Sequence, residues 1–176
     1  GWVPTVPDGM RILVVGGSGG IGAAVCSMLA AGARCTIGVH GASTKPDPSI
    51  FDSDSSTKIV ALQKNLESEE DCLSLVEKFC DEAGGIDGLV HLSGALNFSG
   101  HWKNMPAADW RQDMNINLDQ PFFLSRAAMA KMHSNESGGR IVLNGTESAL
   151  HGGSPVSFPY AIAKKETEAM VQGLAR

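Results

Sequence analysis

The sequence predicts an α/β protein in which a parallel β-sheet is covered by helices on both faces. Short runs of branched apolar residues alternate along the chain with longer segments whose apolar residues recur at helical spacing. Such alternation is typical of parallel sheets, because each crossover helix packs back onto the sheet. With 176 residues, 43% of them hydrophobic, residues 1–176 are expected to form a single domain with its own core.

Five strands are expected from the apolar runs. The first, Arg-Ile-Leu-Val-Val, is rich in branched residues and reads as a strand buried on both faces. The others share its length and are bounded by glycine or by polar residues. The predicted strands cover residues 11–15, 35–39, 58–62, 88–92 and 140–144.

Four helices are expected between and after these strands. The first runs from about Ile21 to Gly32. The second has Ser68 as its N-cap, with three acidic residues in the first turn, where the helix dipole favours anions. A third is predicted over 113–133, after a short turn around 106–110.

Two prolines help to place the remaining elements. Pro121 is expected to kink the early part of the third helix. A loop rich in Gly and Ser is predicted to run to Pro159, and the last helix to begin near Tyr160. The polar segment 41–57, with prolines and several Ser and Asp residues, is expected to be an exposed loop.

The net charge, the length of the apolar runs and the cysteine spacing exclude several classes of binding partner and cellular setting. The net charge of −5 and the lack of a basic stripe argue against nucleic acid or an anionic membrane. No apolar run is long enough to span a bilayer, and no secretory signal is visible. The four cysteines show no C-x-x-C spacing, so they are predicted to be free thiols in a reducing, cytoplasmic setting, with no metal site.

A glycine-rich segment, Val15-Gly-Gly-Ser-Gly-Gly-Ile-Gly22, joins the first strand to the first helix. Its first glycine allows a tight turn, and the later ones let backbone approach a pyrophosphate and let helix pack on strand. Free N–H groups at the helix start attract phosphate. The segment predicts a dinucleotide site of the Rossmann type, lined here by Gly16, Ser18, Gly19, Gly20, Ile21 and Gly22.

The end of the second strand bears on the choice of cofactor. A carboxylate there would bind the ribose 2′-OH of NAD and repel the 2′-phosphate of NADP. The sequence has Gly-Val-His-Gly-Ala-Ser-Thr-Lys instead, with no acid. It therefore favours NADP(H) over NAD(H), with His40, Ser43 and Lys45 as candidate phosphate contacts, although each can also be an ordinary loop residue.

Tyr160 and Lys164 are four residues apart, so they share one face of a helix. A nearby ammonium favours phenolate and is expected to lower the pKa of the tyrosine, which is near 10 when free. The tyrosine is then able to exchange a proton with a substrate oxygen. The pair predicts acid–base catalysis. The alternative is an incidental pair on a surface helix.

Together these motifs resemble the short-chain dehydrogenase/reductase family. The spacing Gly16-x-x-x-Gly20-x-Gly22 is similar to the family's T-G-x-x-x-G-x-G, with valine for threonine, and Tyr160-x-x-x-Lys164 matches its Y-x-x-x-K. The resemblance implies an oxidoreductase that moves hydride between NAD(P) and a small carbonyl or alcohol. Tyr160 would be the general acid/base, and Lys164 would also hold the nicotinamide ribose.

Two further segments resemble the family's cofactor contacts. Asn65 and Leu66 follow the third strand, where the family has an Asp-Val pair that holds the adenine. His91-Leu-Ser93-Gly94 stands in place of N-N-A-G and looks more like the H-x-A-G of ketoreductase domains in larger synthases. His91 itself is expected to be a core histidine with a satisfied hydrogen bond.

The remaining catalytic positions also come from the resemblance. Residues 139–148 resemble G-R-I-V-N-I-S-S, which puts Thr146 at the substrate-orienting hydroxyl, with Ser148 as the alternative; counting back from Tyr160 gives Glu147 instead. Residues 110–118 resemble W-x-x-x-x-x-V-N-L. Asn117 would then hold a water in a proton relay to the lysine, or act structurally on the long helix.

The resemblance covers residues 11–176. In the family, the fold continues into a strand with a Pro-Gly motif, a substrate-binding loop and a final strand, and these elements are not found in this sequence. The sheet is therefore expected to lack its last strands. The chain begins Gly-Trp rather than with Met, so a fragment of a longer polypeptide is expected. A ketoreductase unit and a non-catalytic dinucleotide-binding module remain alternatives. The resemblance also implies a homodimer or tetramer.

Overall fold

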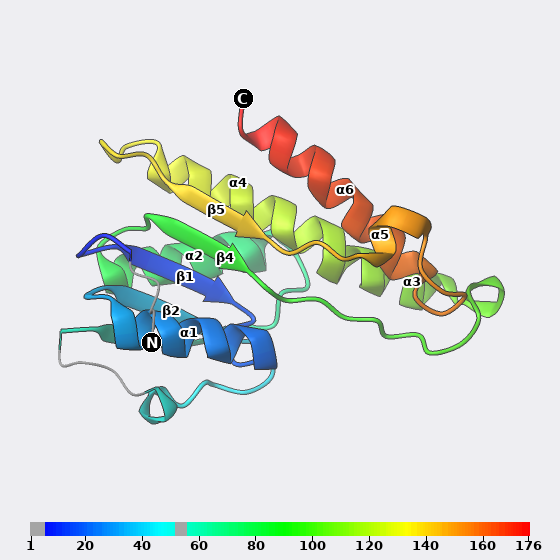
Figure 1. Ribbon diagram of the computed structural model, residues 1–176, viewed down its shortest axis with the longest axis horizontal. Helices are drawn as coiled ribbons and strands as arrows, with labels where there is room; N and C mark the ends of the chain where they lie inside the picture. Colours follow the sequence, from blue (N-terminus) through cyan, green and yellow to red (C-terminus); the bar gives the residue numbers. More distant parts are fainter. Residues whose placement is uncertain (1–5, 52–55) are drawn as a thin grey trace.

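The computed structural model describes residues 6–51 and 56–176 and shows one parallel five-stranded sheet (Figure 1). The strands are β1 (Arg11–Val15), β2 (Thr36–Gly41), β3 (Lys58–Gln63), β4 (Gly88–His91) and β5 (Arg140–Leu143). Their order is β3-β2-β1-β4-β5, and all neighbours are parallel. This order belongs to the doubly wound Rossmann architecture, so the predicted fold class is confirmed. The sheet has fewer strands than the family resemblance implies for a complete fold.

Helices cover both faces of the sheet and complete three layers. Helix α1 (Gly20–Gly32) packs on one face, and α2 (Glu69–Ala83) and α4 (Gln120–Met132) pack on the other (Figure 1). Side chains alternate along β1, since Leu13 joins the core beneath α2 and α4 while Val14 joins the core beneath α1. The apolar run of the first strand is therefore buried on both faces, as predicted.

The helix before α4 starts earlier than the sequence indicated. Helix α3 (Ala107–Met114) begins directly after Pro106, passes into a π-helical turn, η3 (Asn115–Asp119), and continues as α4. The predicted turn at 106–110 was wrong, because the chain after the proline is already helical. The irregularity lies in η3, just before Pro121, which needs no backbone N–H in the first turn of α4.

The chain after β5 also differs in detail from expectation. A one-turn helix, α5 (Ser148–His151), interrupts the predicted loop, and α6 (Phe158–Leu174) includes Pro159 in its first turn, where proline fits. Short turns η1 (Pro48–Ile50) and η2 (Trp102–Asn104) lie in other loops. The predicted loop 41–57 is mostly exposed, although Phe51 is buried; residues 52–55, like the opening Gly-Trp, lie outside the described residues.

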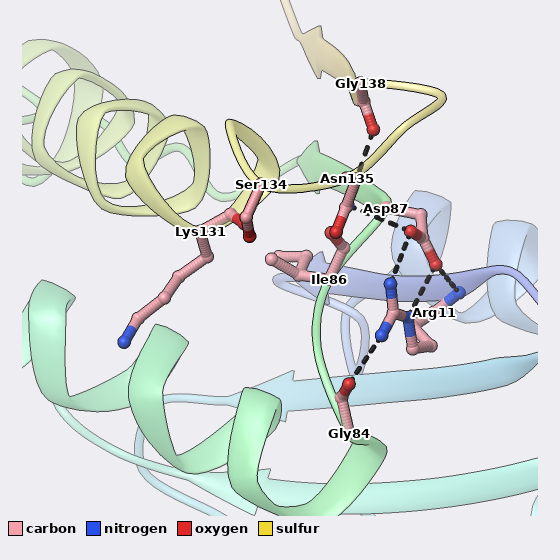
Figure 2. Close-up of polar contacts among 8 residues, drawn as sticks. All are labelled: Arg11, Gly84, Ile86, Asp87, Lys131, Ser134, Asn135 and Gly138. Carbon is pink, nitrogen blue, oxygen red and sulfur yellow. Dashed lines mark hydrogen bonds and ion pairs between the residues drawn. The ribbon is translucent and has the colours of Figure 1, made fainter.

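An ion pair closes the amino edge of the sheet, where the strands begin (Figure 2). Arg11 on β1 donates from Nε and Nη2 to the two carboxylate oxygens of Asp87, at 2.7 and 2.6 Å. Its Nη1 donates to the Gly84 carbonyl at the end of α2, and Asn135 after α4 donates to Asp87 Oδ1. This cluster, the amino-edge clamp, fastens β1, α2, β4 and the segment after α4 together.

The four cysteines are free thiols, as predicted, and three of them are buried. In the ranges that the structure describes, no group of three His, Cys, Asp or Glu residues is arranged to hold a metal ion. None of the described helices is long and apolar enough to cross a membrane.

Candidate functional site

A cleft of about 640 Å³ opens at the opposite, carboxyl edge of the sheet. It lies over the ends of β1 and β4, where the strand order reverses, the place at which doubly wound sheets bind ligands. Residues predicted to contact a cofactor from the glycine loop and the strand ends line it together: Gly16, Ser18, Gly19, Gly20, Ile21, Gly22, His40, Ser43, Asn65, Leu66, Ser93 and Gly94. Lys45 is exposed and does not line it.

Close packing shapes the glycine loop. Gly16 has a φ of +78°, and a Cβ there would lie 2.9 Å from the backbone nitrogen of Ser93. A Cβ on Gly22 would lie only 2.0 Å from the Gly16 carbonyl oxygen. Helix α1 has no acidic residue in its first turn and no side-chain cap, so its first N–H groups and positive dipole end face the cleft uncompensated. The loop fits an anion such as a pyrophosphate.

His40 holds the glycine loop to the end of β3. Its Nδ1 accepts from the Gly16 N–H at 3.4 Å, and its Nε2 lies 2.8 Å from the Lys64 carbonyl oxygen, so Nε2 carries the proton. Burial lowers the pKa of His40, which favours the neutral ring. Both nitrogens are engaged within the protein, so His40 forms a wall of the cleft rather than offering a free donor to a phosphate.

At the end of the cleft that Asn65 and Leu66 line, amide side chains hold the backbone in place. The Leu66 carbonyl accepts from Gln120 Nε2 at 2.6 Å and from Asn115 Nδ2 at 3.1 Å. Asn65 Nδ2 donates to Glu67 at 2.5 Å, which leaves its oxygen as the free end of the amide. The sequence did not single out Gln120, which lines the cleft and is buried; the one signal that it offered was a polar residue three places after Asn117.

Two further predicted site residues, Asn117 and Tyr160, lie beside Gly94, which lines the cleft. A Cβ built on Gly94 would lie 3.2 Å from Asn117 Oδ1 and 3.5 Å from the hydroxyl oxygen of Tyr160. Asn117 is buried in η3, where its Oδ1 accepts from the Ala95 N–H and its Nδ2 donates to the Ala95 carbonyl at 2.7 Å. The loop after β4 is therefore fastened beside Tyr160.

A buried carboxylate supports the same loop and was not foreseen. Asp113 lies four residues before Asn117, on the same helix face, and is fully buried. Its Oδ1 accepts from the backbone N–H and the side-chain amide of Asn97, at 3.0 and 2.6 Å. Its Oδ2 has no hydrogen-bond partner in the described residues. Asp113 thus holds the loop segment that follows Gly94.

The tyrosine–lysine pair is present, but its electrostatics differ from expectation. The Lys164 ammonium lies 5.7 Å from the centre of the Tyr160 ring and donates to Asn144 Oδ1 at 2.9 Å. Burial lowers the pKa of Lys164 to about 8, and burial raises the pKa of Tyr160. The prediction that the ammonium lowers the tyrosine pKa was wrong, because the ammonium is held by Asn144 and desolvation of the phenol dominates.

His91 is a core histidine, as expected, but without the expected hydrogen bond. It ends β4 and is fully buried, and neither ring nitrogen has a hydrogen-bond partner in the described residues. Burial, followed by the charge of Lys164, lowers the pKa of His91 to about 3. The imidazole is therefore uncharged at neutral pH.

The two hydroxyl candidates lie at the start of α5, of which Ser148 is the first residue and which Thr146 precedes by two positions. Thr146 Oγ1 accepts from the Ser148 N–H at 3.3 Å. Thr146 also lines a hollow of about 350 Å³ together with Lys164 and Thr167. Among the described residues no hydrogen bond joins either hydroxyl to Tyr160, so the structure brings Thr146 near the lysine without completing a contact with the phenol.

Comparison with known proteins identifies the family to which a chain with this fold and cleft belongs. The family model of the short chain dehydrogenases matches residues 10–176. The chain belongs to the short-chain dehydrogenase family, which includes NAD(P)-dependent reductases.

Two curated relatives show the range of sizes. The uncharacterized oxidoreductase YuxG of Bacillus subtilis (strain 168) is 29% identical over 159 residues, which are 88% of this chain and 23% of the relative. Elsinochrome reductase 1 of Elsinoe fawcettii is 27% identical over 170 residues, which are 96% of this chain and 62% of the relative. The chain thus spans less than two thirds of the length of both.

Solved structures share the fold. A short chain dehydrogenase from Burkholderia cenocepacia J2315 in complex with NADP is 29% identical, with a TM-score of 0.77 over 96% of this chain and 68% of that one. The NADH-dependent reductase A1-R′ complexed with NAD gives a TM-score of 0.84 at 21% identity, over 94% of this chain and 71% of that one. The second likeness is one of fold alone.

Proposed function

We propose that this chain is the cofactor-binding and catalytic part of an oxidoreductase that transfers hydride between NADP(H) and a carbonyl or alcohol. The observation that carries the proposal is the approach of the Tyr160 hydroxyl and Asn117 to Gly94, a residue that lines the glycine-loop cleft. This approach supports a role for Tyr160 in exchanging a proton with a substrate bound next to the nicotinamide. Residues 1–176 would act as a single NAD(P)-binding domain within a longer polypeptide.

The residues of the cleft fit a dinucleotide. The uncompensated start of α1 would hold the pyrophosphate, Asn65 and Leu66 the adenine, and Ser93 and Gly94 the nicotinamide half. When bound, the cofactor supplies or accepts the hydride. The preference for NADP(H) rests on the acid-free end of β2, with Ser43 exposed at the cleft.

Each catalytic residue has a role that follows from its place. Tyr160 would donate its hydroxyl proton to the carbonyl oxygen as hydride reaches the carbon, and take it back in the reverse direction. The phenol is protonated at neutral pH, the form that donates in reduction, and the rise in its pKa on burial makes it a weaker acid that relies on Lys164. Lys164 would stabilise the phenolate left behind. Thr146 or Ser148 would orient the substrate oxygen, and Asn117 would support the relay to the lysine.

Two other readings each have a specific observation in their favour. A non-catalytic dinucleotide-binding module agrees with the raised pKa of Tyr160 and with an ammonium bonded to Asn144. A ketoreductase unit of a larger enzyme agrees with a relative of which this chain spans only 23%. Both alternatives retain the dinucleotide cleft. In the non-catalytic module Tyr160 would have no catalytic role, and in the ketoreductase unit the domain would be part of a larger enzyme.

Replacing Tyr160 with Phe tests the catalytic assignment. NADPH oxidation by the 176-residue chain with a panel of aldehydes and ketones would be compared with that of Tyr160→Phe. The proposal expects turnover to fall by about 10²–10⁴-fold, with NADPH affinity and unfolding temperature nearly unchanged. Turnover that survives the substitution contradicts the proposal, and NADPH binding without turnover in the parent chain supports the non-catalytic module.

The assembly and location are also proposals. Helices α4 and α6 carry exposed apolar residues, Phe122 and Val171, which fit contact with a second copy in a homodimer or tetramer. Size measurement by light scattering checks this, and a stable monomer contradicts it. The four free thiols fit a reducing compartment such as the cytoplasm.

A further inference from the structure

Lys164 is buried, and its position depends on a neighbouring amide. Its side chain comes from α6 and is 1% exposed, and its ammonium donates to Asn144 Oδ1 at 2.9 Å. Asn144 directly follows β5, one residue beyond the last strand position. A buried ammonium is costly unless it is hydrogen-bonded, so this contact decides where the charge points.

His91 lies beside the same amide. It ends β4 and is paired in register with Leu143, the residue before Asn144. The Asn144 side chain is close enough to the imidazole to raise its pKa, against the larger lowering by burial and by Lys164. A fully buried imidazole without a hydrogen-bond partner is uncommon and calls for a reason.

We propose that Asn144 and His91 are positioning residues for Lys164. Asn144 Oδ1 fixes the direction of the ammonium, and the uncharged imidazole of His91 fixes the Asn144 amide. Asn144 acts to raise the pKa of His91, the direction expected when the amide oxygen faces an imidazole N–H. The single N–H of the neutral ring would therefore point at the same Oδ1 that the ammonium binds and would restrict rotation of the amide. This inference rests on the proposed function, because it concerns the lysine that serves Tyr160.

The surroundings of the ammonium support this arrangement. Besides His91 on β4, the titratable groups near it are Tyr160 and Glu168 on α6 itself, with Glu168 lining the hollow that Lys164 also lines. His40 on β2 acts on His91 rather than on Lys164. No carboxylate forms an ion pair with Lys164 in the described residues. Asn144 is therefore the polar group that sets its direction.

The test is an NMR titration of Lys164 in the 176-residue chain, labelled with ¹³C-lysine and assigned with Lys164→Arg. Asn144→Leu keeps the size but removes the acceptor, so the pKa of Lys164 should fall by about one unit from the parent value, a tenfold change in its dissociation constant. Asn144→Asp supplies a carboxylate and should raise it. Asn135→Leu, at the opposite edge of the sheet, is the matched control and should leave it unchanged.

Opposite shifts from the two Asn144 variants support the inference. Equal shifts, no shift, or a comparable shift in Asn135→Leu overturn it. Should Asn144→Leu fail to fold, Asn144→Asp, which has nearly the same shape, still decides the matter: a Lys164 pKa that does not rise overturns the inference.

His91 is tested by a double-mutant cycle. His91→Phe removes the ring nitrogens and should lower the Lys164 pKa in the same direction as Asn144→Leu, and the double variant should add little. His91→Asn, which restores a polar group, should recover most of the shift. Fully additive effects contradict the inference. The Lys164 pKa shifts are measured without turnover. If turnover survives Tyr160→Phe, the proposed function is rejected, while the outcome of the Lys164 titration still decides whether Asn144 and His91 position the lysine.

Discussion

The polar groups at the two edges of the sheet differ in whether they have hydrogen-bond partners. At the amino edge, Arg11 and Asp87 satisfy each other through paired hydrogen bonds, and Gly84 and Asn135 complete the clamp (Figure 2). At the carboxyl edge, His91 and one oxygen of Asp113 are buried with no partner in the described residues. The amino edge thus has a fully paired network, whereas the end of β4 and the neighbouring helix α3 carry buried polar atoms without a partner in the described residues.

This difference between the two edges indicates that residues at the amino edge contribute mainly to stability and residues at the carboxyl edge mainly to function. Buried polar groups without partners destabilise a fold, so a chain keeps them mainly where they serve a site. The amino-edge clamp joins four segments and contains no cleft residue. Changes at the amino edge should therefore alter the free energy of unfolding, and changes at the carboxyl edge should alter ligand binding and proton transfer.

The largest expected effect is at the glycine loop. Gly22→Ala would place a Cβ 2.0 Å from the Gly16 carbonyl oxygen, which is backbone and cannot move without distorting the loop. NADPH affinity should fall by about 100-fold, measured by fluorescence of the bound nucleotide. Gly173→Ala is the matched control, because a Cβ there meets nothing within 4 Å. Equal affinity of the two variants would contradict the account of the loop.

The next effect is on stability at the amino edge. Arg11→Met leaves the partly buried Asp87 without its ion pair and should lower the free energy of unfolding by about 2 kcal/mol, less than for a fully buried pair because both side chains retain some solvent contact. Urea unfolding measures this. Arg126→Met removes an exposed pair with Glu69 and should cost under about 1 kcal/mol. A marked loss of NADPH affinity in Arg11→Met would break the separation of the two edges.

A smaller effect is expected at the end of the cleft that Asn65 and Leu66 line. Gln120→Met removes the shorter of the two amide contacts with the Leu66 carbonyl, about 1 kcal/mol, so NADPH affinity should fall by about fivefold. Reduced nicotinamide mononucleotide, which lacks the adenosine half, should bind parent and variant alike. Equal losses for both ligands would show that Gln120 acts on the whole cleft.

The smallest effect concerns pH. The Arg11 guanidinium lowers the pKa of Asp87, so folding is favoured by the ionised carboxylate. This contribution is fully present above the unfolded pKa near 3.9 and is lost as the pH falls through the lower folded pKa. The stability advantage of the parent chain over Asp87→Asn should therefore be constant from pH 7 to about pH 5 and shrink below pH 4. An advantage that persists to pH 2 contradicts this reading of the clamp.

Sequence reasoning found the elements that rest on local pattern. The glycine loop, the strand ends and the Tyr160–Lys164 pair follow from spacing, and the structure gathers the loop and strand-end residues around one cleft. The π-helical turn escaped prediction because its backbone and apolar spacing resemble an ordinary helix.

The supporting residues could not be predicted, because their partners are remote along the chain. Gln120 bonds to a carbonyl 54 residues away, and Lys164 to an amide 20 residues away. The direction of the Tyr160 pKa shift could not be predicted for the same reason. The shift is set by desolvation, which depends on the whole fold and not only on the lysine four residues further along the chain.

The central claim is that the carboxyl edge binds a dinucleotide while the amino edge does not. Backbone amide shifts of the ¹⁵N-labelled 176-residue chain, followed during addition of NADPH, test it most directly. Saturable shifts are expected in Gly16 to Gly22, Ser93 and Gly94, and none in Arg11, Asp87 or Asn135. Shifts centred on the amino-edge clamp, or no saturable shift at all, would contradict it.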